Sequence, residues 1–175
     1  MKTPAVVLAL SLTVASVPVV QASDDRFATR LSGFNEVHFS AGPPAALRGA
    51  VSTPAKGSFR ALINDRKDII FYELRYEDLT GAVTQAHIHF GQQHTVGGIV
   101  VWLCQTAGTP APDAVAALTP LCPGPNEGTV TGTITPAQVL EAVGQGLAPM
   151  EFEELVDAIR TGTTYANVHS ATFPP

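Results

Sequence analysis

Two histidines on one predicted strand carry the clearest potential for chemistry in this sequence. His87 and His89 lie two residues apart within 85–90, and residues two apart on a β-strand project from the same face. Two neighbouring imidazoles can hold one metal ion. His169 can add a third nitrogen ligand if its own predicted strand lies beside theirs. Such a set of nitrogen ligands predicts a copper or zinc site.

Further residues could complete this site. His94 follows His89 in a glycine-containing loop and is an additional candidate ligand. Tyr165 and Asn167 share a strand face with His169. We expect them to form hydrogen bonds to the ligand side chains without contacting the metal themselves. The same spacing also fits a hydrogen-bonded pair of core histidines or a half-exposed surface feature, and these two interpretations without metal stay open.

The sequence lacks the motifs of the common hydrolytic and nucleotide-binding sites. It contains no nucleophile elbow, no zinc-protease helix motif and no phosphate-binding loop. This favours a non-catalytic binding module of undefined ligand over an enzyme. A copper- or zinc-binding protein is the alternative.

The length indicates the number of domains, and the charge excludes one class of binding partner. The chain has 175 residues, 15 of them acidic and 10 basic, and its formal net charge is −5. One domain is the default for this length. A nucleic-acid surface needs basic residues to neutralise phosphates, so we expect no nucleic acid. An extracellular or periplasmic protein or ligand is the expected partner.

The N-terminal residues predict export. Lys2 precedes an apolar run over 5–14, and the small residue Ala22 precedes an acidic stretch. This arrangement predicts a signal peptide over 1–22, with a mature domain over 23–175 that is periplasmic or secreted. A membrane anchor would need about 20 apolar residues, and polar residues and a proline interrupt this run. We expect no membrane span after cleavage.

The expected export also predicts the state of the two cysteines. Cys104 and Cys122 are the only two in the chain, and an even count in an exported protein favours a disulfide. A bridge over a loop of this size should contribute roughly 3 kcal/mol of stability. A thiolate metal site is the rival interpretation, but the pair lacks the close spacing typical of one.

The hydrophobic pattern predicts a mainly β fold. Strand patterns cover 27–39, with a bulge or close approach at Gly33, and 57–63, 69–77, 85–90, 99–104, 128–134 and 165–169. The segment 41–50 is predicted to be a loop. About seven or eight strands of this kind are typical of a Greek-key β-sandwich or barrel.

A short helical excursion is predicted near the C-terminus. Thr135, Pro136 and Gln138 form a capping-box pattern, and Val139, Leu140, Val143 and Leu147 continue it as a helical stripe. A second helix is predicted over 151–160, with acids in its first turn, Arg160 in its last and Gly162 as its stop. We expect the apolar residues of 135–162 to pack on the sheet.

Five motifs, in order, resemble those of the CHRD domain, a family named after chordin, the animal antagonist of bone morphogenetic proteins. They are LSGFNEV from Leu31, AHIHFG from Ala86, GIVVWL from Gly98, GTVTGTI from Gly128 and YANVHS from Tyr165. The resemblance covers about 27–173. It implies an extracellular β-rich domain and, for bacterial members, little about activity. In the family a further strand motif usually follows Asn-Val-His, whereas this sequence stops at Pro175, so we expect an exposed sheet edge.

The histidine strand is also similar to a strand of the copper/zinc superoxide dismutases. Their His-Val-His-x-Phe-Gly motif resembles the five residues from His87 onwards. The resemblance implies that His87 and His89 are copper ligands and that His169 is a ligand from a late strand. It also implies a redox role like that of a superoxide dismutase for the copper- or zinc-binding alternative. His94 has no clear counterpart, and the zinc loop of those enzymes is not evident here.

Overall fold

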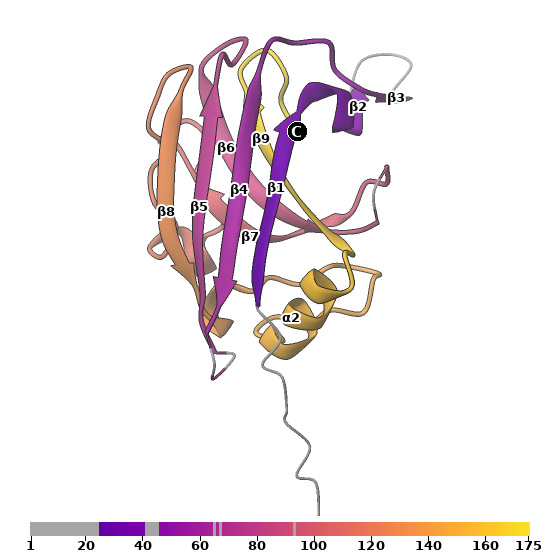
Figure 1. Ribbon diagram of the computed structural model, residues 1–175, viewed down its shortest axis with the longest axis vertical. Helices are drawn as coiled ribbons and strands as arrows, with labels where there is room; N and C mark the ends of the chain where they lie inside the picture. Colours follow the sequence, from indigo (N-terminus) through magenta and orange to yellow (C-terminus); the bar gives the residue numbers. More distant parts are fainter. Residues whose placement is uncertain (1–24, 41–45, 65, 67, 93) are drawn as a thin grey trace, which may run out of the picture.

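The computed structural model describes residues 25–40, 46–64, 66, 68–92 and 94–175 (Figure 1). Its strands form a four-stranded sheet in the order β1-β4-β5-β8, a three-stranded sheet in the order β7-β6-β9, and a small β2-β3 sheet. The strands are β1 (Arg26–Ser32), β2 (His38–Ser40), β3 (Ala46–Gly49), β4 (Lys56–Ile63), β5 (Ile70–Glu77), β6 (Val83–Phe90), β7 (Gly98–Cys104), β8 (Gly128–Ile134) and β9 (Thr164–Ser170).

The two larger sheets pack face to face, and this confirms the predicted mainly β sandwich. The barrel alternative is wrong, because no described strand hydrogen bonds to both sheets and closes them into one. The paired neighbours are antiparallel, and β1, β8, β7 and β9 are edge strands.

The core lies between the two larger sheets. Ile70 and Leu74 of β5 are fully buried, while Phe71 between them is 47% exposed on the outer side. This alternation is what a strand with one buried face requires. The Tyr72 hydroxyl donates to the carbonyl of Leu103 on β7 over 2.7 Å, so a hydrogen bond also joins the sheets through the core.

Strand β6 is buried on both faces. It is the central strand of its sheet, with β7 on one side and β9 on the other. Ala86 and Ile88 belong to the core, whereas His87 and His89 project from the opposite face by the alternation of the strand. Both histidines are nevertheless buried. The polar residues on the outer face of this sheet are therefore shielded from water.

Helix α2 (Phe152–Arg160) lies at the end of the sandwich where β1 begins (Figure 1). Leu155 is 0% exposed and belongs to the core. The Arg160 guanidinium donates to both carboxylate oxygens of Asp25, with its Nη2 2.6 and 2.8 Å from them. The predicted helix over 151–160 is confirmed, and this ion pair ties its last turn to the start of β1.

The predicted continuous strand over 27–39 is wrong. Strand β1 ends at Ser32, and a 3-10 turn (Gly33–Asn35) follows it. The Gly33 carbonyl accepts a hydrogen bond from the Val51 amide at 2.7 Å, and a Cβ at Gly33 would collide with the Val51 carbonyl oxygen. Gly33 is thus a point of close approach, as predicted, but the chain turns there.

The predicted loop over 41–50 is also partly wrong. Strand β3 occupies its second half and pairs with β2 in a short antiparallel sheet. Residues 41–45 lie outside the described residues, as does the predicted signal peptide over 1–22.

The predicted helix following Thr135 is wrong beyond its first turn. A 3-10 turn (Pro136–Gln138) forms, and the Gln138 side-chain oxygen accepts from the Thr135 amide at 3.1 Å. The Leu140 amide then donates to the Val100 carbonyl of β7 at 2.9 Å, instead of to a carbonyl four residues earlier. Val143 is 81% exposed. Pairing with a strand edge has outweighed the helical periodicity.

The loop between the cysteines contains a short helix that the sequence did not predict. The sulfurs of Cys104 and Cys122 are 2.04 Å apart, at bonding distance as predicted. Between them, α1 (Asp113–Ala116) buries Val115. Among the described residues, no helix has the length and apolar character needed to cross a membrane.

Candidate metal centre

The register of the three-stranded sheet brings the chemically interesting side chains to one face. On β6 and β9, His87 pairs with Asn167, and His89 pairs with Tyr165. His169 lies one pair further along, opposite Gln85. Paired residues of antiparallel strands project to the same side, so all these side chains share the outer face of this sheet.

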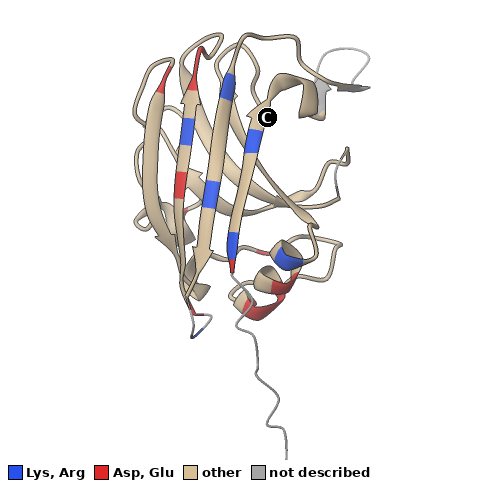
Figure 2. Cartoon of the chain, in the orientation of Figure 1, with Lys and Arg blue, Asp and Glu red and all other residues tan. Residues whose placement is uncertain are grey.

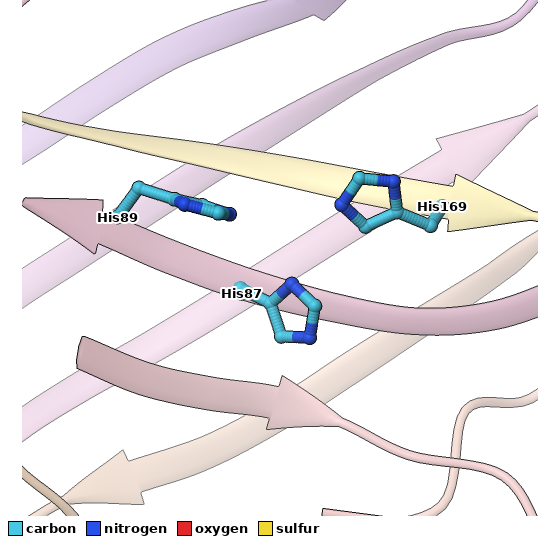
Figure 3. A group of neighbouring side chains, drawn as sticks. All are labelled: His87, His89 and His169. Atoms are coloured by element: carbon cyan, nitrogen blue, oxygen red, sulfur yellow. The ribbon is translucent and has the colours of Figure 1, made fainter. Parts of the chain in front are cut away.

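His87, His89 and His169 form a compact cluster on this face (Figure 3). One nitrogen from each ring lies within 4.8 Å of the others. The ring centre of His87 is 5.6 Å from that of His89 and 5.4 Å from that of His169. All three residues are buried, His87 completely. The structure therefore brings together the three histidines that the sequence singled out.

A hydrogen bond determines which nitrogen of His89 faces the cluster. His89 Nδ1 lies 2.9 Å from the Gly97 carbonyl oxygen. A carbonyl can only accept, so Nδ1 carries the proton, and Nε2 of the neutral ring keeps its lone pair. This Nε2 is buried and has no hydrogen-bond partner among the described residues. Metal-binding histidines commonly have this arrangement.

Tyr165 holds the same ring from another direction. Its ring stacks on His89 with centres 4.8 Å apart and planes 4° from parallel. Its hydroxyl oxygen accepts a hydrogen bond from the Gly97 amide at 3.1 Å. Position 97 must be glycine here, because a Cβ would collide with the Phe90 carbonyl oxygen. We call these contacts of Gly97 with His89 and Tyr165 the Gly97 clamp.

The imidazole of His87 lies at the centre of the cluster. Neither of its ring nitrogens has a partner among the described residues. The half-buried Trp102 of β7 meets its ring edge to face, with centres 4.3 Å apart. Burial lowers the pKa of His87 to about 2, and the nearby His169 and His89 contribute to this shift.

The pKa of His89 is also lowered by burial. The Gly97 hydrogen bond, the Glu36 carboxylate and the nearby Asn167 side chain offset this only in part. His87 and His89 are therefore neutral at ordinary pH, and a neutral imidazole is the form that binds metal.

The cluster fits a transition-metal ion with a modest adjustment. Zinc-to-nitrogen distances of about 2.0–2.1 Å imply that the ligand nitrogens lie about 3.3–3.6 Å from one another. The most widely separated nitrogens here, up to 4.8 Å apart, would have to close by about 1.2–1.5 Å for an ion to bind. Asn167 Oδ1 is also buried without a hydrogen-bond partner among the described residues and could accept a hydrogen bond from a ligand at the ion.

His94 does not join the three histidines. It is exposed in the loop between β6 and β7, and its backbone φ is 66°. It is not part of the group whose nitrogens converge. The sequence suggested it only through its proximity to His89 along the chain.

Trp102 and Gly97 were not predicted as part of this site. Trp102 belongs to an apolar run that lacks alternation, so the pattern gave no sign that it faces His87. The Gly-Gly pair at 97–98 indicated a turn, but nothing in it indicated a contact with His89.

Comparison with known proteins places the chain in a family. Neither the curated proteins nor the solved structures contain a match to it. The family model of the CHRD domain matches residues 27–175, which include all strands of the sandwich except the first residue of β1. The protein therefore belongs to the CHRD domain family.

Proposed function

We propose that this protein is an exported binding module that holds one copper or zinc ion through His87, His89 and His169. The observation that carries this proposal is the convergence of three buried imidazoles on one sheet face. Two of them present nitrogens that no described residue satisfies.

The energetic cost of the unsatisfied nitrogens supports a metal over a structural hydrogen-bond network. A buried polar atom without a partner costs about 1–3 kcal/mol. In a structural network, the nitrogens of His87 would bond to neighbouring donors or acceptors, and among the described residues they do not. A bound cation would use the same lone pairs favourably.

Copper(II) is expected to bind more tightly than zinc. Nitrogen sites generally follow the Irving–Williams order, in which Cu²⁺ exceeds Zn²⁺. The ligands are neutral imidazoles with no carboxylate in the converging group. The predicted signal peptide and the cysteine pair support export, so metal would be acquired outside the cytoplasm.

Trp102 provides a direct test of this proposal. It is the only tryptophan in the chain, and it contacts His87. We expect stoichiometric Cu(II) to quench its fluorescence, with saturation at one ion per chain and a weaker response to Zn(II). The mature protein should be produced without a histidine tag.

Matched variants separate the site from other histidines. His169→Asn should reduce the affinity for Cu(II) at least tenfold, whereas His94→Gln should leave it unchanged, because His94 is exposed and outside the group. Circular dichroism should show that both variants are folded. Equal quenching curves for wild type and a folded His169→Asn variant would contradict the proposal.

A further inference from the structure

The outer face of the four-stranded sheet is basic although the protein is acidic. Of the ten lysines and arginines in the chain, five project from this face, and the face carries two carboxylates, Glu73 and Glu77. Figure 2 shows the basic positions gathered on β1, β4 and β5. We call this surface the basic face. Its cations are Arg26, Arg30, Lys56, Arg60 and Arg75.

The four arginines of this face form a group centred on Arg60. The register pairs Ala28 with Arg60 and Ser58 with both Arg30 and Arg75. Arg26, Arg30 and Arg75 are therefore all diagonal neighbours of Arg60, at about 7–8 Å. All four are exposed. Their guanidinium groups can reach adjacent anionic groups on a single ligand.

The described residues do not neutralise these arginines. Lys56 lies 3.5 Å from Glu77 and 3.2 Å from Asp78, but the described residues form no ion pair with any of the four arginines. Glu73 is directly opposite Arg60 in the register and still does not form one. Diagonal neighbours on a sheet are within reach of long side chains, so these like charges repel one another, and a bound polyanion would remove this repulsion.

Apolar and hydroxyl groups accompany the charges. Leu62 and Phe71 are opposite each other and are 40% and 47% exposed. The neighbouring strand β8 adds a row of exposed hydroxyls from Thr129, Thr131 and Thr133. The face therefore combines cations, one aromatic ring and a ladder of hydroxyls on a regular sheet surface.

We propose that the basic face binds an extended acidic polysaccharide bearing carboxylate or sulfate groups. Arginine forks bind such groups through paired hydrogen bonds. The apolar face of a sugar ring can pack on Phe71, and the threonine hydroxyls can hydrogen bond to sugar hydroxyls. A membrane surface fits less well, because the apolar residues lie on strands of a sheet face and not on a projecting loop.

Charge balance also disfavours a general affinity for polyanions. With a net charge of −5, the protein as a whole does not attract an anionic chain. Binding therefore depends on this local group of arginines.

Binding assays with immobilised polysaccharides test this proposal. The probes are heparin as the sulfated chain, polygalacturonate as the carboxylated chain and dextran as the neutral control. We expect binding to at least one acidic chain and none to dextran, and the affinity should weaken as salt rises, because salt screens exposed charges. Arg60→Gln should weaken binding by up to about fivefold, since single exposed ion pairs contribute about 0.2–1 kcal/mol. The triple Arg30→Gln/Arg60→Gln/Arg75→Gln variant should abolish it.

Arg66→Gln is the matched control. Arg66 is an exposed cation outside the basic face. Arg66→Gln alters the net charge by the same amount as Arg60→Gln and should leave binding unchanged. An equal loss with Arg66→Gln, equal binding to dextran, or binding only to phosphatidylglycerol vesicles or duplex DNA would overturn the proposal. All substituted side chains are exposed, so the variants should fold.

Discussion

At the level of single residues, the Gly97 clamp explains how His89 is held ready for a metal ion. The Gly97 carbonyl accepts from His89 Nδ1, and its amide donates to the Tyr165 hydroxyl, while the Tyr165 ring stacks on the imidazole. These contacts hold both the tautomer and the orientation of the ring. Hydrogen-bonded partners of this kind contribute to metal affinity without touching the ion.

Tyr165→Phe tests the clamp. The substitution keeps the stacked ring but removes the oxygen that accepts from Gly97. We expect the Cu(II) affinity to fall by up to about tenfold, at the lower end of the effects of outer partners. Competition against a chelator of known affinity measures this change. An unchanged Kd for Tyr165→Phe would show that the hydroxyl does not help to position His89.

The pKa of His87 predicts how stability depends on pH. In the folded protein the pKa is lowered from 6.5 to about 2, so below pH 6.5 the unfolded chain binds more protons at this residue. The free energy of unfolding of the metal-free protein should therefore fall as pH drops below about 6.5, by at most about 1.4 kcal/mol per pH unit for one histidine. Above that pH this contribution should be constant.

Denaturant titrations between pH 5 and 7 measure this slope. The comparison is His87→Leu, which replaces the imidazole with a buried apolar side chain. The slope should be smaller in the variant. The same slope in both proteins would assign the pH dependence to other groups.

The sequence predicted the three histidines and the presence of Tyr165 beside them, but not Gly97 and Trp102, which also contact them. His87 and His89 were identifiable because two-residue spacing on a strand determines the face, and His169 because its own strand has the same pattern. Gly97 lies in a loop, where contacts depend on tertiary structure. Trp102 lies in a run that is apolar throughout, so alternation could not assign its face.

At the level of elements, α2 and the segment before it show when periodicity predicts a helix. The stripe that includes Leu155 is confirmed, because α2 has a long amphipathic pattern and an ion pair at its last turn. The stripe over 139–147 is equally regular but includes Gly144 and Gly146, whose φ values are 76° and 85°. Its Leu140 amide donates to the Val100 carbonyl of β7 instead.

Two substitutions test whether α2 packs in the core while the segment 139–147 does not form a buried helical stripe. Leu155→Ala should lower the free energy of unfolding by about 2–5 kcal/mol, because it leaves a cavity at a fully buried site. Val143→Ala should change it by less than about 0.5 kcal/mol, because Val143 is 81% exposed. Chemical denaturation of both variants provides the values. A loss below about 0.5 kcal/mol for Leu155→Ala would show that α2 is peripheral to the core.

At the level of the whole molecule, the sandwich carries two separate surfaces. The histidine cluster lies on the three-stranded sheet, and the basic face lies on the outer side of the four-stranded sheet. The cluster and Arg60 lie on different sheets of the sandwich, which are about 10 Å apart when packed face to face. The two surfaces should therefore act independently.

This independence predicts that Arg60→Gln leaves the Cu(II) affinity within about twofold of wild type at 0.15 M salt. Likewise, His169→Asn should leave polysaccharide binding unchanged. A large effect of either substitution on the other surface would show coupling through the core. Calorimetric titrations of the two variants make the comparison.

The most direct test of the central claim is calorimetric titration of the untagged mature protein with Cu(II) at neutral pH, beside His87→Gln and His94→Gln. The account predicts one tight site in wild type and in His94→Gln, and its loss in a folded His87→Gln variant, because His87 is the buried central member of the cluster. No binding above background in wild type, or equal affinity in wild type and His87→Gln, would contradict a metal site at this cluster.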